Sequence, residues 1–429
     1  MVDRGDWNGS GNDLFLSASL ILMYRRDTEQ RAKRTMTTTT ALQVTLLRHQ
    51  REIQEALRRA VMNARVAALS SGASDLQAFY GQIEYHLGWV DTTFSPVSSN
   101  PGKLLRPTLL LLAYEASGAR GLPTSTEVFE SHPCNDASAS THGQQGCKEV
   151  YLSRALPAAA AVELTHNFTL IHDDIEDGDT ERRHRSTLWK LWGIPQAINT
   201  GDGLFALARL TLWGVLDEGV EGAIAARLGA VLDHACLVLA EGQYLDISFE
   251  ERQDIAVAAY ADMTSRKTAA LMACAAEMGA ILGTSDEEAI KRLRGFGHAM
   301  GVAFQVRDDL LGVWASTAES GKTPAGDVYR RKKSLPFLYA LEHAHADDKR
   351  YLREVYQQEA ALTSEQVEEI LTIFERTQTK KYCRAFLAEQ CRLAAEALAS
   401  VPRTKSPVSS RAIDDMQTLV HFVEEASKE

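Results

Sequence analysis

Apolar residues recur at spacings of three and four positions through most of this chain of 429 residues. The pattern is first clear in LQVTLLRHQREIQEALRRAVMNARVAAL, which begins at Leu42 and carries charged residues between the apolar ones. This period places the apolar residues on one face of an α-helix, whereas the strict alternation typical of β-strands is almost absent. Only 11 prolines interrupt the chain, and 45% of its residues are hydrophobic. The sequence therefore predicts a large all-α domain rather than an α/β fold.

Further helices are predicted where Ala- and Leu-rich amphipathic stretches recur, over residues 104–118, 153–175, 186–214, 222–246, 253–281, 286–312, 334–345, 348–376 and 380–399. Residues 119–150 break the pattern because they are rich in Ser, Thr, Gly, Asn and Pro and show no periodicity. We expect a long polar surface loop there, inserted into the helical domain. The loop contains His132, Cys134, His142 and Cys147, but their spacing matches none of the common structural zinc sites.

The N-terminal segment lacks the features of a targeting signal. LFLSASLILMY, at residues 14–24, is apolar but short, and two basic residues follow it, which reverses the order found in a secretory signal. The segment MTTTTALQV resembles a new start at Met36. We therefore interpret residues 1–41 as an N-terminal extension, either disordered or from a mis-assigned start, and place the folded domain at residues 42–429. No stretch approaches the ~18 consecutive apolar residues that a membrane span requires.

Charge and cysteine content restrict the partners and the compartment. The formal net charge of −11 and the isoelectric point of about 5.6 argue against general affinity for nucleic acid or anionic membranes. A polyanionic substrate would therefore need local Lys and Arg residues or a bound metal. The six cysteines are scattered, which is typical of reduced thiols in a cytoplasmic protein rather than of a disulfide framework.

The strongest chemical signal is the DDxxD pattern of Asp173, Asp174 and Asp177 in HNFTLIHDDIEDGDTERRHRSTLW. On a helix, Asp173 and Asp177 lie about 5.4 Å apart along the axis and on one face. Two carboxylates ~6 Å apart repel by roughly 3 kcal/mol at an effective dielectric constant near 20. Bound Mg²⁺ would reverse that repulsion, since it prefers hard oxygen ligands and bridges carboxylates to phosphates.

The alternative is that these acids are merely the solvated end of an exposed helix. Their neighbours favour a site instead. The apolar residues Phe168, Leu170 and Ile171 precede the acids, which indicates a helix that is buried up to the cluster. Arg182 and Arg183 follow directly, and arginine suits a phosphate-rich ligand.

A second acid cluster occurs in FQVRDDLLGVW, where Asp308 and Asp309 follow an apolar run and Gln305 lies one turn earlier. Gly312 occupies the position where a third acid would complete a second DDxxD pattern. We expect the two acid clusters to face each other across the bundle and to hold several metal ions around one diphosphate. Candidate cations that could contact a diphosphate are Lys103, Arg106, Lys267, Lys322, Lys332 and Lys333.

Six motifs, in this order, resemble those of the trans-isoprenyl diphosphate synthases of the polyprenyl synthetase family. GKLLRP resembles the family's GKRxRP, DDIED followed by RR its first aspartate-rich motif, and EGQYLDISFE its GQxxD segment. SRKTAAL carries the KT pair, FQVRDDLLG resembles the second aspartate-rich motif, and KKSLP resembles KxTxP. The resemblance covers roughly residues 75–345. It implies a single large helical bundle of the isoprenoid synthase type, with a central apolar cavity, that is usually a homodimer.

The resemblance also implies roles for individual residues. Mg²⁺ ions that hold the allylic diphosphate would be bound by Asp173, Asp174, Asp177, Asp308 and Asp309. The same diphosphate would be contacted by Arg182, Lys267 and Lys332, with help from Lys322. The diphosphate of isopentenyl diphosphate would be bound by Lys103, Arg106, His166 and Arg183. Thr268 and Gln305 would flank the allylic carbon and stabilise the positive charge that develops there.

The implied activity is a condensation of isopentenyl diphosphate with an allylic diphosphate (dimethylallyl, geranyl or farnesyl). Phe168 and the smaller Thr169 lie five and four positions before Asp173, a pattern similar to that of enzymes that form geranylgeranyl diphosphate, with farnesyl diphosphate as the next candidate product. Three residues depart from the family pattern: Leu104, Ser186 and Gly312. They leave two alternatives open, a class I terpene cyclase on the same fold and a non-catalytic subunit of a heteromeric synthase. Chain elongation is favoured because the residues expected to bind isopentenyl diphosphate are all present.

Overall fold

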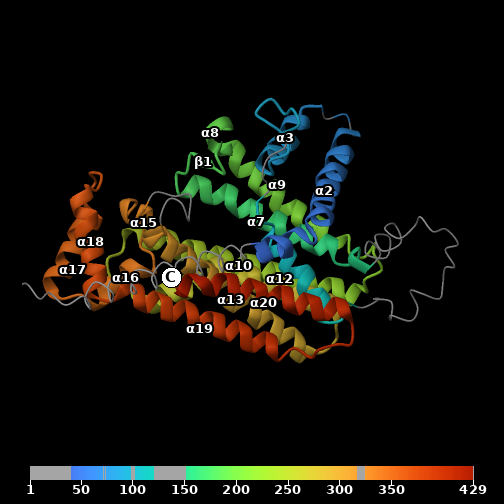
Figure 1. Ribbon diagram of the computed structural model, residues 1–429. Helices are drawn as coiled ribbons and strands as arrows, with labels where there is room; N and C mark the ends of the chain where they lie inside the picture. The colour runs from blue at the N-terminus through green and yellow to red at the C-terminus, as the bar shows by residue number, and fades with distance from the viewer. Residues whose placement is uncertain are drawn as a thin grey trace, which may run out of the picture.

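The computed structural model in Figure 1 describes residues 40–70, 72, 74–97, 102–119, 151–315 and 324–428. Nearly all of the N-terminal extension and of the polar insertion lies outside the described residues, as do the four candidate zinc ligands and Lys322. The expectations for these segments therefore stay predictions.

Within the described residues the chain is almost entirely helical, which confirms the all-α prediction (Figure 1). After a helical stretch over residues 40–47, the helices are α2 (Gln50–Ser70), α3 (Leu76–His86), α4 (Leu105–Ala116), α7 (Leu156–Glu176), α8 (Leu188–Trp192), α9 (Ile194–Trp213), α10 (Gly222–Glu251), α11 (Val257–Thr264), α12 (Ala270–Gly283), α13 (Glu287–Trp314), α15 (Gly326–Tyr329), α16 (Leu335–His343), α17 (Ala346–Gln357), α18 (Ser364–Arg376), α19 (Thr379–Ala399) and α20 (Pro407–Lys428). A π-helical turn, η1 (Ser265–Ala269), joins α11 to α12, and the short strands β1 (Glu181–Arg182) and β2 (Arg185–Ser186) form an antiparallel hairpin.

The centre of the bundle is formed by α4 and α12, which are buried around almost their whole circumference. α12 packs against α4 on one side and against α13 on another. Glycines permit this close approach. A Cβ atom at Gly279 would lie 2.1 Å from the carbonyl oxygen of Leu110, and one at Gly301 would lie 2.5 Å from Cα of Ala269. These contacts hold the helices that carry the GKLLRP, KT and second aspartate-rich motifs in fixed relative positions.

Three long predicted helices are interrupted in the structure. Gly193, with a φ of 83°, separates α8 from α9, because this left-handed conformation does not continue an α-helix. The stretch predicted over residues 253–281 changes to a π-helical turn at η1. Between α17 and α18 the chain leaves the helix, and Thr363 starts α18 with a capping box that includes Gln366. These interruptions depend on local backbone geometry that hydrophobic periodicity does not report.

Helix α10 is more apolar than the sequence analysis allowed. An 18-residue window within it has a mean hydropathy of 1.7, so the helix is long and apolar enough to cross a membrane by composition alone. Only 33% of that window is buried inside the molecule. Leu237 and Tyr244 on α10, and Leu210 on the neighbouring α9, are 60%, 73% and 69% exposed. The two helices therefore present an apolar face that the rest of the described chain does not cover.

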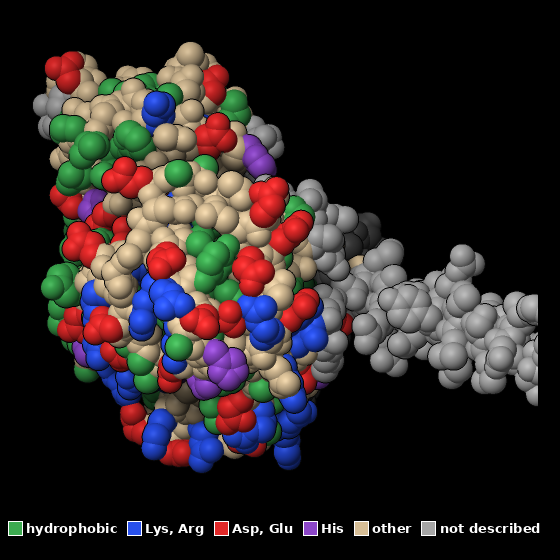
Figure 2. Space-filling model, turned by 90° about the vertical axis from the view of Figure 1, so that its left-hand side faces the viewer, with side chains coloured by type: hydrophobic (Ala, Val, Ile, Leu, Met, Phe, Trp, Pro, Cys, Tyr) green, Lys and Arg blue, Asp and Glu red, His purple; other side chains and the backbone are tan. Residues whose placement is uncertain are grey.

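Helices α17 and α18 project from one end of the bundle (Figure 1). On the face viewed from that end, acidic and basic side chains are interspersed (Figure 2). Arg376, for example, forms ion pairs with Asp348 at 2.8 Å and with Glu369 at 3.0 Å. This face has no continuous basic surface of the kind that nucleic-acid binding requires.

Candidate active site

The first acid cluster lies at the carboxyl end of α7. Asp177 caps the helix, and its backbone N–H donates to the carbonyl oxygen of Asp173 at 2.8 Å. Burial raises the pKa of Asp173 to about 6; Lys267 opposes this shift, and the charge of Asp177 adds to it. Burial also raises the pKa of Asp177. The carboxyl end of a helix carries partial negative charge, so these two acids are unfavourably placed unless a cation binds them.

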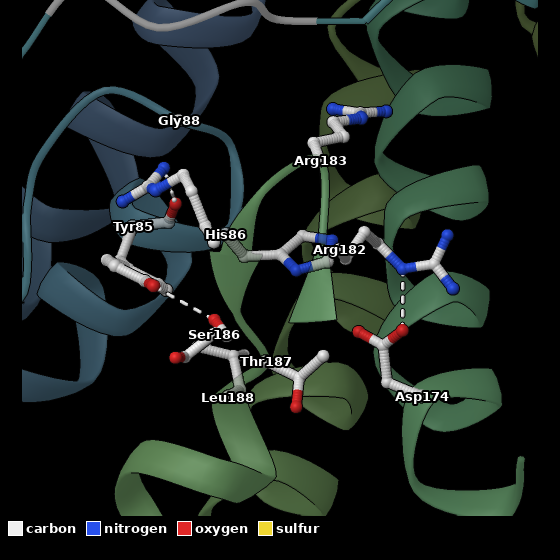
Figure 3. A pocket seen from close by; sticks show the side chains of 10 residues that line it. Tyr85, His86, Gly88, Asp174, Arg182, Arg183, Ser186, Thr187 and Leu188 are labelled. Atoms are coloured by element: carbon white, nitrogen blue, oxygen red, sulfur yellow. Dashed lines mark hydrogen bonds and ion pairs between the residues drawn. The ribbon is translucent and has the colours of Figure 1, made fainter. Parts of the chain in front are cut away.

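Asp174, between them in sequence, points elsewhere and has a protein partner. Its carboxylate is buried and accepts a hydrogen bond of 2.6 Å from Nε of Arg182 (Figure 3). Burial raises the pKa of Asp174 to about 6, and Arg182 acts against that shift. The β1–β2 hairpin brings Arg182 to this position through a two-residue turn in which Arg183 and His184 both have positive φ. Both residues were predicted to belong to the site, but nothing in the sequence indicated that they pair.

The EGQYLDISFE segment lies on α10 and connects the acid cluster to η1. A Cβ atom at Gly242 would lie 2.2 Å from the backbone nitrogen of Lys267, so only glycine allows α10 to approach η1 this closely. Gln243 donates to Glu176 at 2.7 Å, and Asp246 accepts from Nζ of Lys267 at 2.5 Å. Burial alone would lower the pKa of Lys267, but Asp246 and Asp173 outweigh it and the pKa is raised. The ammonium group therefore stays charged.

The π-helical turn also carries Thr268, whose hydroxyl donates to Oε1 of Gln305 on α13 at 3.1 Å. The amide nitrogen of Gln305 in turn donates to Oδ1 of Asp309 at 3.0 Å. These bonds bring the KT motif and the second aspartate-rich motif together. π-Helical turns are frequent at functional sites.

Asp308 and Asp309 have different surroundings. The side chain of Asp308 is 62% exposed and lies 3.8 Å from Arg307. Asp309 is fully buried and receives hydrogen bonds from the Tyr260 hydroxyl, from Gln305, from Nζ of Lys332 at 3.4 Å and from the backbone N–H of Leu335 at 3.1 Å. Both of its oxygens already have donors, which differs from the open carboxylate expected of a metal ligand.

The two lysines of KKSLP have separate roles. Lys332 lies beside Asp309, whose charge is the main reason that the pKa of Lys332 is raised. Lys333 instead donates to the backbone carbonyl oxygens of Phe249, Glu250 and Arg252 at 2.9, 2.7 and 2.6 Å. Lys333 thus supplies hydrogen-bond donors to the backbone carbonyl groups at the carboxyl end of α10 and is not available to a ligand.

The predicted isopentenyl diphosphate site contains several arginines close together. The guanidinium group of Arg183 lies over Gly102 of the GKLLRP segment: a Cβ atom at Gly102 would be 2.6 Å from it. Burial lowers the pKa of Arg106, and its Nε is buried without a hydrogen-bond partner. The pKa of His166 is held well below its usual range, mainly by burial and secondly by the positive charges of Arg106 and Arg183. Its imidazole is therefore neutral at pH 7. Lys103 of the same segment is exposed.

Two neighbours of this site were missed by the sequence analysis. His86, from α3, lines a cavity of about 50 Å³ together with Arg182 and Arg183, and its ring points toward Arg182 (Figure 3). Burial is the main cause that lowers the pKa of His86 to about 3, and the positive charge of Arg183 is the second. Burial also raises the pKa of Glu163 to about 7. Neither His86 nor Glu163 lies in one of the sequence motifs. The region around them has an excess of positive charge, which suits an anionic ligand.

The predicted chain-length residues lie on α7 below the acids. The ring of Phe168 packs edge-on against Phe205 of α9, with centroids 5.0 Å apart. Thr169 is buried, and its hydroxyl donates to the carbonyl oxygen of His166 at 2.8 Å. The departures from the family pattern are accommodated: Leu104 is buried at the start of α4, and the carbonyl oxygen of Ser186 accepts from the Tyr85 hydroxyl at 2.9 Å.

The acid side chains fit a divalent cation that is shared with a ligand. In the part of the chain that the structure describes, no group of three His, Cys, Asp or Glu side chains is arranged to hold a metal ion by itself. Asp173 and Asp177 nevertheless lie together at a helix carboxyl end, where Lys267 offsets only part of their charge and a bound cation would stabilise both. Mg²⁺ commonly keeps waters and phosphate oxygens in its coordination shell, so few protein ligands suffice.

Comparison with known proteins agrees with this geometry. Residues 88–374 match the polyprenyl synthetase family. The chain belongs to this family. The polyprenyl synthetase chain is 37% identical to a geranylgeranyl diphosphate synthase of Mycobacterium tuberculosis over 284 residues, which cover 66% of this chain and 71% of the relative. It is also 33% identical to a (2E,6E)-farnesyl diphosphate synthase of Mycobacterium bovis over 341 residues, covering 80% of this chain and 84% of the relative.

A crystal structure of a polyprenyl synthetase from Streptomyces coelicolor A3(2) matches the fold with a TM-score of 0.67 and 33% identity, covering 86% of this chain and 98% of that one. Family membership confirms the resemblance drawn from the six motifs. The structure of this polyprenyl synthetase brings those motifs to one region of the bundle, with Lys322 alone among the predicted site residues outside the described chain.

Proposed function

We propose that this polyprenyl synthetase condenses isopentenyl diphosphate with an allylic diphosphate to form a short-chain trans-prenyl diphosphate. Two separate groups of side chains, each suited to one diphosphate, support the proposal. Lys267 and Lys332 would bind the allylic diphosphate. The cationic region around Arg106, His166 and Arg183 would bind isopentenyl diphosphate. A terpene cyclase ionises one diphosphate and has no use for the second group.

Mg²⁺ would be held by Asp173, Asp177 and Asp308, and when bound it would draw negative charge from the leaving diphosphate. Lys267 and Lys332 stay protonated beside their carboxylate partners and add positive charge at the same place. The allylic C–O bond then breaks with no need for a protein acid. We infer that Asp174 and Asp309 serve as buried partners of Arg182 and Lys332 instead of binding metal directly.

The reaction of the allylic cation needs a site that excludes water and contains few nucleophiles. The side-chain oxygens of Thr268 and Gln305 would lie beside the allylic cation and stabilise its charge, and each is held by the hydrogen bond between them. The double bond of isopentenyl diphosphate attacks the cation, a new C–C bond forms, and a proton leaves to the released pyrophosphate. The neutral imidazole of His166 can donate to the isopentenyl diphosphate without adding a mobile proton near the cation.

Geranylgeranyl diphosphate is the proposed main product, and farnesyl diphosphate is the next candidate. Phe168 and Phe205 form a paired aromatic barrier below the acid cluster, from two different helices. Such a barrier would stop a chain that grows down between α7 and α9. The activities named for the two mycobacterial relatives, geranylgeranyl and farnesyl diphosphate synthesis, differ by one five-carbon unit. The position of the barrier is therefore expected to decide between them.

A homodimer is the proposed assembly, with the apolar face of α9 and α10 at its centre. Leu210, Leu237 and Tyr244 on this face are more than half exposed in the single chain. A contiguous apolar face of this kind marks an interaction surface. A second copy would cover it and would account for the apolar composition of α10 without a membrane.

A reducing compartment such as the cytoplasm is the proposed location. The four cysteines in the described residues, Cys236, Cys274, Cys383 and Cys391, are buried and form no disulfide bond. Burial also raises the pKa of Cys274 well above its usual range, which keeps that thiol protonated and unreactive.

The proposed activity is tested by incubating the purified protein and Mg²⁺ with geranyl or farnesyl diphosphate, with and without labelled isopentenyl diphosphate. Label in longer prenyl diphosphates is the expected result. A hydrocarbon formed without isopentenyl diphosphate would show a cyclase, and no turnover with any allylic substrate would indicate a non-catalytic subunit. Arg183→Gln should raise the KM for isopentenyl diphosphate more than that for the allylic substrate.

A further inference from the structure

The second aspartate-rich motif lacks its third acid, and the structure shows what occupies that place. Gly312 lies one turn after Asp308 on α13. A Cβ atom at Gly312 would lie 2.2 Å from Oδ2 and 2.4 Å from Cγ of Asp327. No side chain of any size fits there while Asp327 keeps its position. The carboxylate of Asp327 thus fills the space in which the side chain of a third acid would begin.

Asp327 is held in this position by the short helix α15. Ala325 precedes the helix with a φ of 53°, and Val328 is buried beside Asp327 and anchors the turn. Asp327 itself is only 4% exposed. Its Oδ1 accepts from Arg330 at 2.7 Å, and its backbone carbonyl oxygen accepts from the N–H of Lys332 at 2.9 Å. The carboxylate is therefore directed toward α13 by its own turn.

Lys332 lies between two buried carboxylates from different helices. Its Nζ is 3.4 Å from Oδ1 of Asp309 on α13 and 4.0 Å from Oδ2 of Asp327 on α15. An unpaired buried charge is costly, and Lys332 is a cation close to both acids, while Arg330 is a second partner of Asp327 alone. The charges of Asp309 and Asp327 both raise the pKa of Lys332. The ammonium group thus has a buried carboxylate partner on each of two helices, α13 and α15.

We propose that Asp327 is a positioning residue that supplies, from α15, the carboxylate absent at Gly312, and that it holds Lys332 in place for the allylic diphosphate. A carboxylate is then present beside Gly312, but it is supplied by α15 and not by α13. This inference rests on the proposed function only for the identity of the substrate. The contacts of Lys332 with a diphosphate can be measured without turnover.

The test is a set of variants that moves the carboxylate back to α13. Asp327→Asn should weaken the binding of inorganic pyrophosphate, and raise the KM for the allylic diphosphate, by roughly tenfold, as expected for one charge-assisted contact. The KM for isopentenyl diphosphate should change little. Gly312→Asp alone should lower both activity and thermal stability, because the new side chain meets Asp327. The double variant Gly312→Asp with Asp327→Gly should recover most of the pyrophosphate affinity.

Arg330→Gln is the matched control, since it removes the other partner of Asp327 and leaves Lys332 in place. It should leave pyrophosphate binding nearly unchanged. The proposal is overturned if Arg330→Gln weakens binding as much as Asp327→Asn, or if Asp327→Asn only lowers thermal stability. It is also overturned if the double variant binds no better than Gly312→Asp. Calorimetric binding of pyrophosphate keeps these outcomes separate from the proposed function, which fails only if the wild-type protein does not elongate an allylic substrate.

Discussion

Gly242 on α10 lies directly against the backbone of Lys267 in η1, so that a Cβ atom at Gly242 would be 2.2 Å from the Lys267 nitrogen. The contact places backbone against backbone, and no side chain can rotate to relieve it. It fixes the π-helical turn that presents Lys267 and Thr268 to the site. α10 is therefore a support for this turn as well as the helix at which we propose that two chains meet.

Gly242→Ala should displace η1 and reduce kcat at least tenfold, with a loss of stability of about 1–3 kcal/mol, the usual cost of overpacking. Steady-state kinetics and urea unfolding measure the two effects. Gly222→Ala on the same helix is the control, because its Cβ atom would meet nothing within 4 Å. Equal kinetic behaviour of the two variants would show that the contact does not support the catalytic turn.

Tyr260→Phe should destabilise the fold by about 1.5–3 kcal/mol, since it removes a hydrogen bond to the buried carboxylate of Asp309. The free energy of unfolding in urea is the measurement. Tyr329→Phe, on a side chain that is 39% exposed and lies outside the proposed dimer face, should change that free energy by less than about 0.5 kcal/mol. A Tyr260→Phe variant as stable as Tyr329→Phe would indicate that Asp309 does not depend on this donor.

Asp173→Asn should stabilise the protein near pH 7 in the absence of metal while it abolishes activity. The pKa of Asp173 is raised to about 6, above its usual value of 3.8, so the folded state binds an extra proton between these pH values. The contribution of the protonated carboxyl to stability is complete below pH 3.8 and is lost as the pH rises through 6. The gain on removing the charge is on the order of 1 kcal/mol once solvent screening is allowed for.

Thermal unfolding of wild type and Asp173→Asn with a chelator, at pH 4 and at pH 7.5, checks this prediction. The difference between the two proteins should be present only at the higher pH. Mg²⁺ with pyrophosphate should stabilise the wild type and not the variant. A variant that is less stable than the wild type at pH 7.5 would contradict the assigned sign.

Phe168→Ala should shift the products to longer prenyl diphosphates by removing one ring of the Phe168–Phe205 pair. Product lengths are read by chromatography after phosphatase treatment. Phe386→Ala, at a partly buried ring on α19, should leave the product lengths unchanged. Identical product lengths in wild type and Phe168→Ala would exclude this pair as the barrier.

Leu237→Glu should convert a dimer to monomers, because it places a charge at the centre of the exposed face of α10. Sedimentation equilibrium measures the mass directly. Leu393→Glu is a matched control on α19, where the side chain is 40% exposed and lies on another helix. If the mass of the wild type is already that of one chain, the proposed assembly is wrong.

Much of the site could be predicted from local spacing. The three- and four-residue period of apolar residues is enough to indicate helices, and the four-residue interval between Asp173 and Asp177 places both carboxylates on one helix face. The order of the motifs was enough to identify the family. These inferences succeed because helical geometry relates residues that are close in sequence, whatever the rest of the chain does.

The pairing of charges could not be predicted in the same way. Asp174 and Asp309 are parts of acid motifs, yet each is buried against a cation, Arg182 and Lys332 respectively, that arrives from another element. Asp327 reaches the space at Gly312 only because α15 packs against α13. Sequence patterns record which charges are present, whereas the cost of burying each charge depends on the partner that packing brings to it. For that reason helices and motif order followed from the chain alone, whereas the cations that pair with Asp174, Asp309 and Asp327 were decided by the fold.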